Sequence, residues 1–567
     1  MKKIKLILGL AASLFTMTGC YDLDVYPEDQ LSTGTFFKTK DHADQAMMGV
    51  YSLLRDQNAF GWQFSYDCLG GISAGYDNPS LQVIAKGTYT TTTGVIGGKF
   101  KTLYEGISRA NIVLQNVDNC NMSDEDKARY KGEAKFMRAL FYFSLLDFYG
   151  GVPIYDENTV VAEDFMNMLK PRSSAEEVRK FILADLDEAA SVLPEKWDEL
   201  NHGRATSGSA TALKGKVLLY NKQYADAQKC FEKVVNSGLY ELYDDYADLF
   251  KPGGDDSSEM IFAIQNMGGI GTDFGMPMCF YMGSRSSYGS CWNNVMVETN
   301  FVDSYEYKDG RPFDWEEVMP GYTTSDQVKK DFWYSTPNSA KNKVEKYTPY
   351  RDQILAMYEA RDPRMNASII LPYTLYKGWV NNAPKICEFA LVGKQLHEKD
   401  GYVRINHNEE SYLWRKFVPE HNMDGALTNR AHTPINFPLI RLADVYLMLA
   451  ECLNEAGNQD KAVEYINKVR ERAGIALLND GKSWNEARSK SEVFKRIVHE
   501  RRVELACEGL SFSDMKRWGM LETLNGKVVG LAGKFMYNRL AEERDYLWPM
   551  PQEEMDINES LEQNPGW

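Results

Sequence analysis

The chain has 567 residues, of which 64 are Lys or Arg and 80 are Asp or Glu, so its formal net charge is −16 at pH 7. An acidic surface repels phosphate groups, which argues against a nucleic acid partner and against electrostatic binding to anionic lipid headgroups. A chain of this length has room for several domains of about 150 residues each, although helical-repeat proteins often exceed that size.

The first twenty residues have the pattern of an export signal. Three lysines lie within the first five residues, the apolar run Leu6–Phe15 follows, and a Met-Thr-Gly-Cys sequence ends at Cys20. The apolar run is too short for a permanent membrane-spanning helix, and no later stretch is long and apolar enough. The Met-Thr-Gly-Cys sequence resembles a bacterial lipobox, which predicts cleavage after residue 19 and lipid attachment to the Cys20 thiol. Residues 20–40 would then be the tether. The alternative is an ordinary secretory signal with a chance cysteine.

Helical patterns fill the first part of the chain, apart from one irregular stretch. Residues 60–98 are rich in Gly, Ser, Thr and aromatic residues and keep no helical period. We interpret them as a long irregular excursion, a type of segment that often carries function. Ser174 and Glu177 have the spacing of a capping box at the start of one helix, which Pro194 ends. Helices are predicted at residues 41–54, 99–117, 124–149 and 174–193.

One pattern, a helical hairpin, occurs twice. Phe437–Gly474 predicts two helices joined at Gly457-Asn458, with Gly474 ending the second helix. Its residues follow the spacing of a tetratricopeptide hairpin, in which small side chains let two helices approach closely. The same pattern occurs 235 residues earlier, within Ser207–Ser237. The equivalent pairs are Gly215 and Ala450, Leu218 and Leu453, Ala227 and Ala462, Phe231 and Ile466, and Val234 and Val469.

The region between the hairpins differs in character from the hairpins themselves. Residues 260–265 look like a strand, residues 266–431 are mostly loop with short strands, and this loop-rich part holds five of the 11 Trp residues. Residues 491–519 predict one more helix and turn. The sequence therefore predicts a mostly α fold: a tetratricopeptide-like scaffold of helical hairpins with long irregular loop excursions and a few short strands. We expect residues 41–240 and 258–567 to form two parts that pack as one globular unit.

Six separated blocks resemble one family, in order and spacing. They are GEAKFMRALFYFSLLDFYGGVP from residue 132, GRATSGSATALKGKVLLYNKQYADAQKCFEKVVNSGLYEL from 203, ARDPRM from 360, the second hairpin from 438, HERRVELACEGLSFSDMKRWG from 499 and LWPMPQEEMDINESLEQNPGW from 547. Together they are similar to the SusD/RagB family of outer-membrane nutrient-binding lipoproteins from Bacteroidetes. Ser511 departs from the family pattern, which usually has a basic or large residue there.

The resemblance implies a location and a mechanism. Family members sit on the cell surface, attached to the outer membrane by lipid, as lids over a SusC-like TonB-dependent transporter. They bind oligosaccharides or, in some members, peptides. The tetratricopeptide side packs mainly on the transporter, and the irregular excursions form the ligand surface.

Aromatic residues in the two excursions are therefore the candidate ligand-binding residues. Sugar rings have apolar C–H faces that stack on exposed aromatic rings, while Asp, Asn and Arg bond the hydroxyl groups. The alternative for each aromatic residue is a place in the core. Trp414, Trp518 and Trp548 lie in structural blocks of the family and are left out. The candidates are Trp62, Tyr66, Asp67, Tyr76 and Asn78 in the first excursion, and Tyr281, Arg285, Tyr288, Trp292, Trp315, Trp333 and Tyr334 in the second.

Enzymatic patterns are weak. Gly71–Gly75 matches the G-x-S-x-G nucleophile motif, but turn sequence follows it where that motif needs a helix. The seven His residues are scattered, and we find no catalytic constellation. A lipid-anchored glycoside hydrolase and a repeat scaffold that binds only proteins remain as alternatives. No cofactor is expected, although a structural calcium ion would need no fixed motif.

Cysteine positions leave one question open. Cys230, Cys452 and Cys507 fall in helical patterns and are expected to be buried thiols. Cys68, Cys279 and Cys291 lie in loop-like sequence, where spacing does not decide whether any two of them pair.

Overall fold

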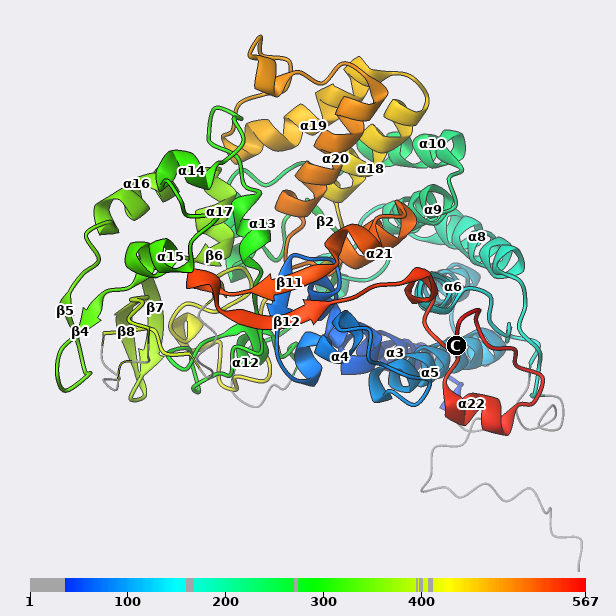
Figure 1. The fold of residues 1–567 in the computed structure, drawn as a ribbon. Coiled ribbons are helices and arrows are strands. Elements are labelled where there is room, and N and C mark those ends of the chain that lie inside the picture. The colour runs from blue at the N-terminus through cyan, green and yellow to red at the C-terminus, as the bar shows by residue number, and fades with distance from the viewer. Residues whose placement is uncertain (1–35, 160–167, 270–273, 394–395, 397–400, 406–410) are drawn as a thin grey trace, which may run out of the picture.

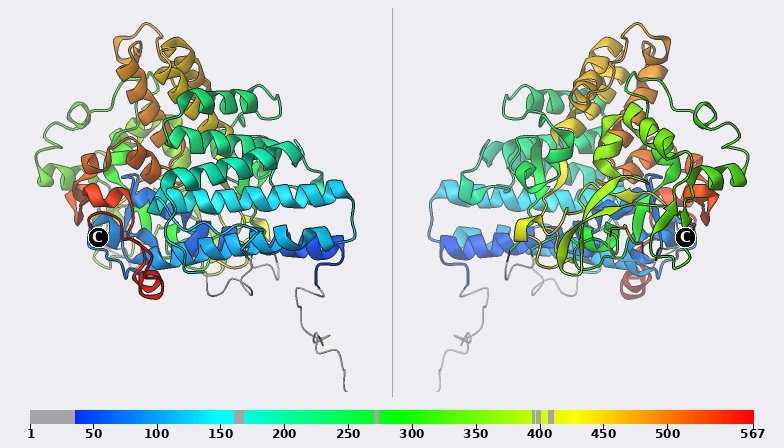
Figure 2. Two further views of the ribbon diagram at one scale, coloured as in Figure 1. Left: turned by 90° about the vertical axis from the view of Figure 1, so that its right-hand side faces the viewer. Right: turned by 90° about the vertical axis from the view of Figure 1, so that its left-hand side faces the viewer.

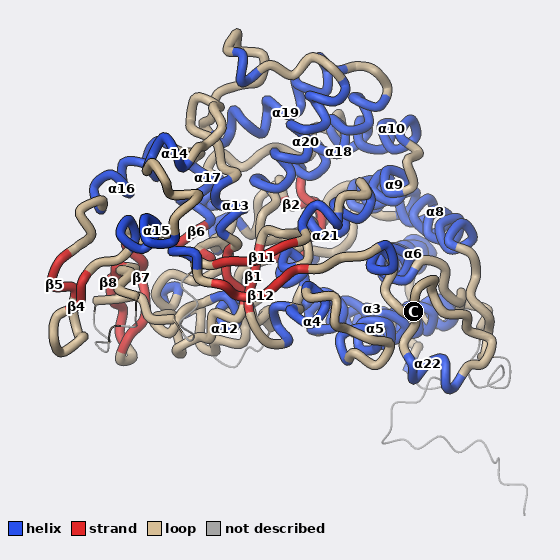
Figure 3. The backbone as a smooth tube through the Cα atoms, viewed as in Figure 1, coloured by secondary structure: helices blue, strands red, loops and turns tan. Residues whose placement is uncertain are grey.

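We describe the fold from a computed structural model, which covers residues 36–159, 168–269, 274–393, 396, 401–405 and 411–567. The predicted export signal and Cys20 lie outside these described residues. The described part is mostly helical with a few short strands, which confirms the predicted fold class (Figures 1 and 3).

The α-helices are α3 (Lys40–Tyr51), α4 (Gln82–Ala85), α5 (Gly94–Asn116), α6 (Asp124–Tyr149), α8 (Ala175–Val192), α9 (Ser207–Tyr220), α10 (Tyr224–Val235), α11 (Tyr246–Leu249), α12 (Met278–Met282), α13 (Thr299–Asp303), α14 (Trp315–Val318), α15 (Asp326–Trp333), α16 (Arg351–Ala360), α17 (Pro363–Ser368), α18 (Leu442–Glu455), α19 (Gln459–Ala473), α20 (Lys490–Glu504), α21 (Ser511–Arg517) and α22 (Gln552–Ile557).

Successive helices stack into a layered scaffold. α5 packs on α6, α6 on α8, α8 on α9 and α9 on α10. The left view of Figure 2 shows these helices one above another, from blue to green. α10 then packs on α18, which contacts both α19 and α20. The stack therefore joins helices from both halves of the chain. None of the described helices has the length and apolar character needed to cross a bilayer.

The two predicted hairpins are α9–α10 and α18–α19, and they are neighbours in this stack. The helix crossing in the first hairpin requires a small residue, because a Cβ atom added to Gly215 would lie 2.6 Å from the ring of Phe231. Gly474 ends α19 with a left-handed φ of 69°, as the sequence indicated. The prediction was wrong for Phe437–Arg441. This segment forms strand β10, because it pairs with β2 (Met260–Ile264) before the helix begins.

The helix starts follow from local sequence. At α8, the Ser174 hydroxyl accepts from the backbone of Glu177, while the Glu177 carboxylate accepts from the backbone of Ser174. This reciprocal capping box satisfies N–H groups that the first helical turn leaves without partners. The same arrangement begins α20, with Ser489 and Glu492.

The strands form small sheets rather than one continuous sheet. Each sheet in the described part has two antiparallel strands. The pairs are β1 (Ser73–Gly75) with β3 (Val295–Val297), β2 with β10, β4 (Thr336–Pro337) with β5 (Val344–Lys346), β6 (Ile369–Ile370) with β9 (Leu413–Trp414), β7 (Leu375–Val380) with β8 (Ala383–Glu388), and β11 (Gly526–Val529) with β12 (Phe535–Arg539). The β1–β3 pair matters most here, because it joins the two excursions.

Much of the first excursion is packed inside the protein. Residues 60–98 contain short helical turns, β1 and α4, but Phe64 and Ile72 belong to the buried core. The Ser511 hydroxyl donates to the carbonyl of Gly70 at 2.8 Å. A Cβ atom at Gly70 would lie 2.3 Å from the same hydroxyl oxygen. The small side chain of Ser511 therefore suits the close approach of this excursion to α21.

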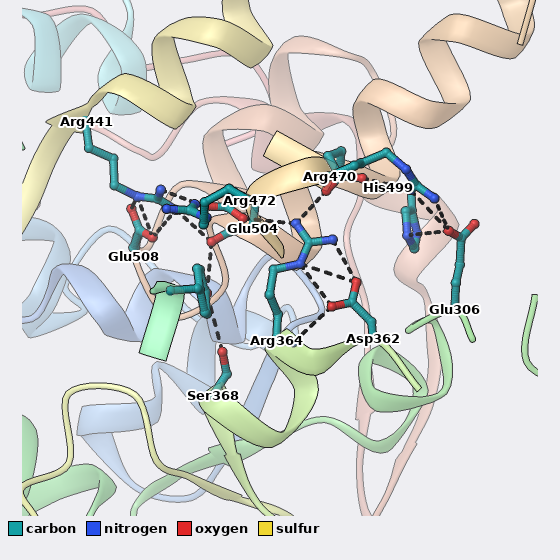
Figure 4. A network of polar contacts seen from close by, with 12 residues as sticks. Glu306, Asp362, Arg364, Ser368, Arg441, Arg470, Arg472, His499, Glu504 and Glu508 are labelled. Carbon is teal, nitrogen blue, oxygen red and sulfur yellow. Dashed lines mark hydrogen bonds and ion pairs between the residues drawn. The ribbon is translucent and has the colours of Figure 1, made fainter. Parts of the chain in front are cut away.

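Buried charges join the loop-rich insertion to the helical scaffold (Figure 4). Arg364 of α17 pairs with Asp362 at 2.7 Å and with Glu504 of α20 at 2.9 Å. Arg441, at the end of β10, pairs with Glu504 at 2.8 Å and with Glu508 at 2.8 Å. These side chains are at most 1% exposed. A buried charge is costly unless a partner compensates it, so each pair holds its two segments together.

The same network extends to the second hairpin. Arg470 of α19 pairs with Glu500 at 3.1 Å and with Glu306 of the insertion at 3.2 Å. Burial alone would raise the pKa of Glu500, but Arg364 and Arg470 outweigh it and lower that pKa. Carboxylates held ionised by arginines are unsuited to donate a proton. The network is therefore structural, and it contains charged residues of the ARDPRM and HERRVELACEG blocks.

Candidate functional site

The β1–β3 pair brings the two predicted excursions together. Gly75 lies opposite Val295, and a Cβ atom on Gly75 would lie 1.8 Å from the carbonyl oxygen of Asn294. Only glycine allows this close approach of the two backbones. The next residue, Tyr76, donates its hydroxyl hydrogen to the carbonyl of Trp292. The junction therefore fixes the position of Trp292 from the other excursion.

Four aromatic rings lie in sequence along this junction. Trp62 meets Tyr281 edge-on with ring centres 5.5 Å apart, Tyr281 meets Phe280 at 4.9 Å, and Phe280 meets Trp292 at 5.5 Å. The indole of Trp292 is 39% exposed, and the other three rings are partly buried. We call Trp62, Phe280, Tyr281 and Trp292 the aromatic surface.

Guanidinium groups flank the aromatic surface. Arg285 lies 5.7 Å from the ring centre of Trp292, and Arg430 lies 4.5 Å from that of Phe280. Arg430 also donates to the carbonyls of Gly289 and Ser290, both at 2.5 Å. Arg430 thereby holds the end of the loop that carries the predicted residues Arg285 and Tyr288.

A second aromatic pair borders the same loop. Tyr288 and Trp379 have ring centres 5.5 Å apart, and the Tyr288 hydroxyl donates to the carbonyl of Thr428 at 3.2 Å. Sequence reasoning missed Phe280, Trp379 and Arg430. Phe280 stands next to the candidate Tyr281, but Trp379 and Arg430 reach this place only through the tertiary fold.

This arrangement is suited to binding a neutral, ring-shaped ligand. Aromatic faces take up apolar C–H groups, and guanidinium groups donate several hydrogen bonds in fixed directions. Of the four rings, only that of Trp292 is exposed, so this ring is the one available to stack on a ligand.

Three candidates of the first excursion have structural positions instead. Tyr66 is 3% exposed and packs against Phe148 and Trp548, and Tyr76 is 7% exposed. Asp67 is fully buried and accepts from the backbone N–H of Ser511 at 3.3 Å. Burial raises the pKa of Asp67 to about 7, although neighbouring backbone N–H groups oppose the shift. These three side chains therefore have the core position that was the alternative for each candidate, and they lie outside the aromatic surface.

The tryptophans of α14 and α15 are also core residues. Trp315 stacks on Tyr322 with ring centres 3.8 Å apart and is 7% exposed. Trp333 is fully buried, and its indole N–H donates to the Tyr322 hydroxyl at 2.8 Å. The prediction of exposed platforms was wrong for both residues. Tyr334 is partly buried beside Gly393, away from the aromatic surface. Asn78 is exposed just beyond the β1–β3 junction and stays a candidate.

Two cavities elsewhere in the protein are less suitable as ligand sites than the aromatic surface. A cleft of about 1230 Å³ lies between α3 and residues 192–204, and two of its charged lining residues, Arg204 and Asp44, pair with each other. A cavity of about 270 Å³ lined by Tyr104 and Tyr155 is smaller than most ligand pockets, which measure roughly 300–1,000 Å³. Neither cavity is lined by a ring of the aromatic surface.

The weak enzymatic pattern has a structural explanation. Ser73 of the Gly71–Gly75 motif lies in β1, is fully buried, and its hydroxyl accepts from the indole of Trp414 at 3.2 Å. It is therefore not presented at a sharp exposed turn, as a nucleophile would be. No group of three or more His, Cys, Asp or Glu side chains is arranged to hold a metal ion within the described ranges.

Comparison with known families agrees with this fold. The SusD family pattern matches residues 258–567, and a second pattern, described as "starch-binding associating with outer membrane", matches residues 23–219. The chain therefore belongs to the SusD family. Members of this family are carbohydrate-binding proteins rather than enzymes, so the chain is not a glycoside hydrolase. Glycan binding and association with the outer membrane are properties of the family.

Individual relatives cover almost the whole chain. SusD-like protein P25 of Formosa agariphila is 26% identical over 92% of this chain and 90% of its own length. Starch-binding protein SusD of Bacteroides thetaiotaomicron is 24% identical over 88% of this chain and 83% of its own. A SusD-like carbohydrate-binding protein of Bacteroides fragilis has the same fold, with a TM-score of 0.73 and 22% identity, covering 93% of this chain and all of that one.

Proposed function

We propose that the protein is a cell-surface lipoprotein that captures oligosaccharides at the aromatic surface and delivers them to a SusC-like TonB-dependent transporter. The observation that carries the proposal is the exposed Trp292 ring, flanked by Phe280 and Arg285 and placed by the β1–β3 junction. An exposed aromatic group with adjacent hydrogen-bond donors is what a sugar chain requires.

The relatives support a glycan as the ligand. One of them is named for starch binding, and a solved neighbour is described as carbohydrate binding. The aromatic surface also suits glycans other than starch, because every pyranose ring has an apolar face. A peptide ligand is the second candidate within the family, and it would use the same rings with its own aromatic or proline side chains.

The lipid anchor and the transporter are parts of the proposal that rest on the sequence. The lipobox-like sequence at Cys20 would attach the chain to the outer membrane, and the family resemblance implies the transporter. Globomycin, which blocks lipoprotein signal cleavage, would leave the full-length precursor in cells if Cys20 is the lipidated residue. Co-purification of the transporter with a tagged form of the protein in mild detergent would test the complex. An excess of tag-free protein should abolish this co-purification.

Calorimetry against a panel of neutral oligosaccharides tests ligand binding. We expect saturable binding of at least one glycan, with no shorter product released on prolonged incubation. Binding of peptides but of no glycan would replace the ligand class, and release of shorter sugars would overturn the binding-protein proposal itself.

A further inference from the structure

Two cysteines lie side by side at the ends of the loop that carries the candidate ligand residues. The sulfur atoms of Cys279 and Cys291 are 3.4 Å apart, and both side chains are fully buried. They form a small apolar cluster with Leu427, separate from the main core, against which Tyr288 and Met423 pack. The structure thus brings together two of the three loop cysteines that the sequence left undecided.

The backbone of this loop closes on itself between the two cysteines. The N–H of Gly283 donates to the carbonyl of Cys279 at 2.8 Å, and the N–H of Cys291 donates to the carbonyl of Ser284 at 3.0 Å. The N–H of Trp292 donates to the carbonyl of Phe280 at 3.0 Å. The two cysteine backbones are therefore held close together independently of their sulfur atoms.

The other loop cysteine has different surroundings. The carbonyl of Cys68 accepts from Arg539 at 3.1 Å, next to the ion pair of Arg539 with Glu298. The thiol of Cys507, which lies in the turn after α20, contacts the thioether of Met282 at 3.4 Å. Neither contact is to another thiol, so the two sulfurs at 279 and 291 are the pair that geometry favours.

We propose that Cys279 and Cys291 form a disulfide bond in the exported protein, and that this bond clamps the ligand loop. A disulfide needs its sulfur atoms at about 2.05 Å, so a closure of roughly 1.4 Å is required. Side-chain rotation can supply a shift of this size, because the closed loop already positions the two backbones.

The reaction is an exchange with an external disulfide. One cysteine thiolate attacks the oxidant's disulfide, forming a mixed disulfide and releasing one oxidant thiolate. The second cysteine loses its proton and displaces the remaining oxidant sulfur. Two protons and two electrons leave the cysteines, and the oxidant is reduced to a dithiol. Dithiol–disulfide oxidoreductases supply such an oxidant in the bacterial periplasm, through which an exported protein passes.

Because the two thiols are buried in the folded protein, this exchange is expected to occur during folding. The hydrogen bond with Cys291 and burial together hold the pKa of the Cys279 thiol well above its usual range. The attacking species is a thiolate, so exchange in the folded protein is slow and is expected during folding, before the cluster with Leu427 closes. The same burial then protects the finished bond from reductants.

The consequence for binding rests on the proposed function. The clamp encloses Tyr281, Arg285 and Tyr288 and ends beside Trp292. A loop restrained in its bound conformation loses less conformational entropy when ligand binds, so the clamp raises affinity without adding a contact.

Peptide mapping of the exported protein tests the bond directly. Arg285 lies between the cysteines, so trypsin cuts the loop and leaves its two halves joined only by a disulfide. We expect one joined peptide pair that separates after reduction. Complete labelling of both cysteines by iodoacetamide in denatured, unreduced protein would show that no bond exists.

A second measurement tests whether the disulfide bond affects stability and glycan binding. We expect the double variant Cys279→Ala/Cys291→Ala to melt several degrees lower than wild type and to bind glycan a few-fold more weakly. Cys230→Ser is the matched control, because Cys230 lies on α10, and it is expected to change neither quantity. A joined peptide pair with unchanged affinity in the double variant would overturn the clamp role alone. If wild-type protein binds no glycan at all, the proposed function is overturned, while the proposal of a disulfide bond still stands.

Discussion

Tyr76 and Trp292 are 216 residues apart in the sequence, and the hydroxyl of Tyr76 donates a hydrogen bond to the backbone carbonyl of Trp292. This contact shows how the fold uses a buried residue of one excursion to place an exposed residue of the other. The aromatic residues thus fall into two groups, those proposed to bind ligand and those that hold them in position.

Trp292→Ala should weaken glycan binding about tenfold or more, because an exposed anchor ring commonly contributes over 1 kcal/mol to binding. Its unfolding free energy should change by less than about 0.5 kcal/mol, as for other surface positions. Trp484→Ala is the matched control, since Trp484 is 37% exposed and Trp292 is 39% exposed. Calorimetry with the best glycan of the panel measures both variants. Equal affinities for the two variants would remove Trp292 from the site.

Gly75→Ala should reduce both stability and affinity. The new methyl group would overlap the Asn294 carbonyl, which forces β1 and β3 apart at a cost of about 1–3 kcal/mol. Gly49→Ala is the control, because a Cβ atom there has no neighbour within 4 Å and the site is helical. Urea unfolding and calorimetry together give the two quantities. If Gly75→Ala kept wild-type affinity, Trp292 would not depend on the junction for its position.

Trp333→Ala should behave unlike Trp292→Ala. Trp333 is fully buried, so its loss leaves a large cavity and should lower the unfolding free energy by about 3–5 kcal/mol. At temperatures where the variant stays folded, glycan affinity should be near the wild-type value. A variant that is stable but unable to bind would return Trp333 to the ligand site.

Arg364→Met should destabilise the protein by about 3–5 kcal/mol, because the buried Asp362 would lose its ion pair and Glu500 and Glu504 would each lose one of their buried partners. Lys461→Met provides the contrast. Its partner Glu464 is 59% exposed, and an exposed pair contributes at most about 1 kcal/mol. Urea midpoints of the two variants decide the matter, and similar small shifts would mean that water reaches the network.

Asp444 should make the protein sensitive to acid. Burial alone would raise its pKa, but Lys216 and Arg501 outweigh burial and lower the pKa to about 2, from an ordinary 3.8. A carboxylate whose pKa is lower in the folded state adds stability that is complete above pH 4 and is lost as the pH falls through 2. The difference corresponds to roughly 2 kcal/mol.

The Asp444→Asn variant checks this assignment. We expect its unfolding free energy to fall less than that of wild type between pH 4 and pH 2, and to be lower than wild type at pH 7. Denaturant unfolding at several pH values provides the comparison. Parallel curves for the two proteins would assign the acid sensitivity to other carboxylates.

The sequence predicted those features that local patterns encode. The offset of 235 residues located both hairpins, because small residues at a helix crossing recur at fixed spacing. Burial of single aromatic residues was not predictable in the same way. Trp292 and Trp333 both occur in the loop-rich insertion, yet one is 39% exposed and the other fully buried, because exposure depends on neighbours that are distant in sequence.

Arg430, which flanks the aromatic surface, was also not predictable from local sequence. Arg430 lies 140 residues from Ser290, whose carbonyl it contacts, and no spacing rule connects them. For strand β10, by contrast, the sequence did contain an indication. Phe437–Arg441 precedes a helix and was assigned to it, although its partner strand had been predicted at residues 260–265.

The buried ion pairs also restrict how the molecule can move. Arg364 and Arg441 both bond Glu504, so the insertion, β10 and α20 share one buried charged junction. A hinge between insertion and scaffold would have to separate these charges without water to solvate them, which is far more costly than bending a solvated linker. Any movement that opens or closes the aromatic surface over a partner therefore carries the helical stack with it as one rigid body. The pivot of such a movement has to lie outside this junction.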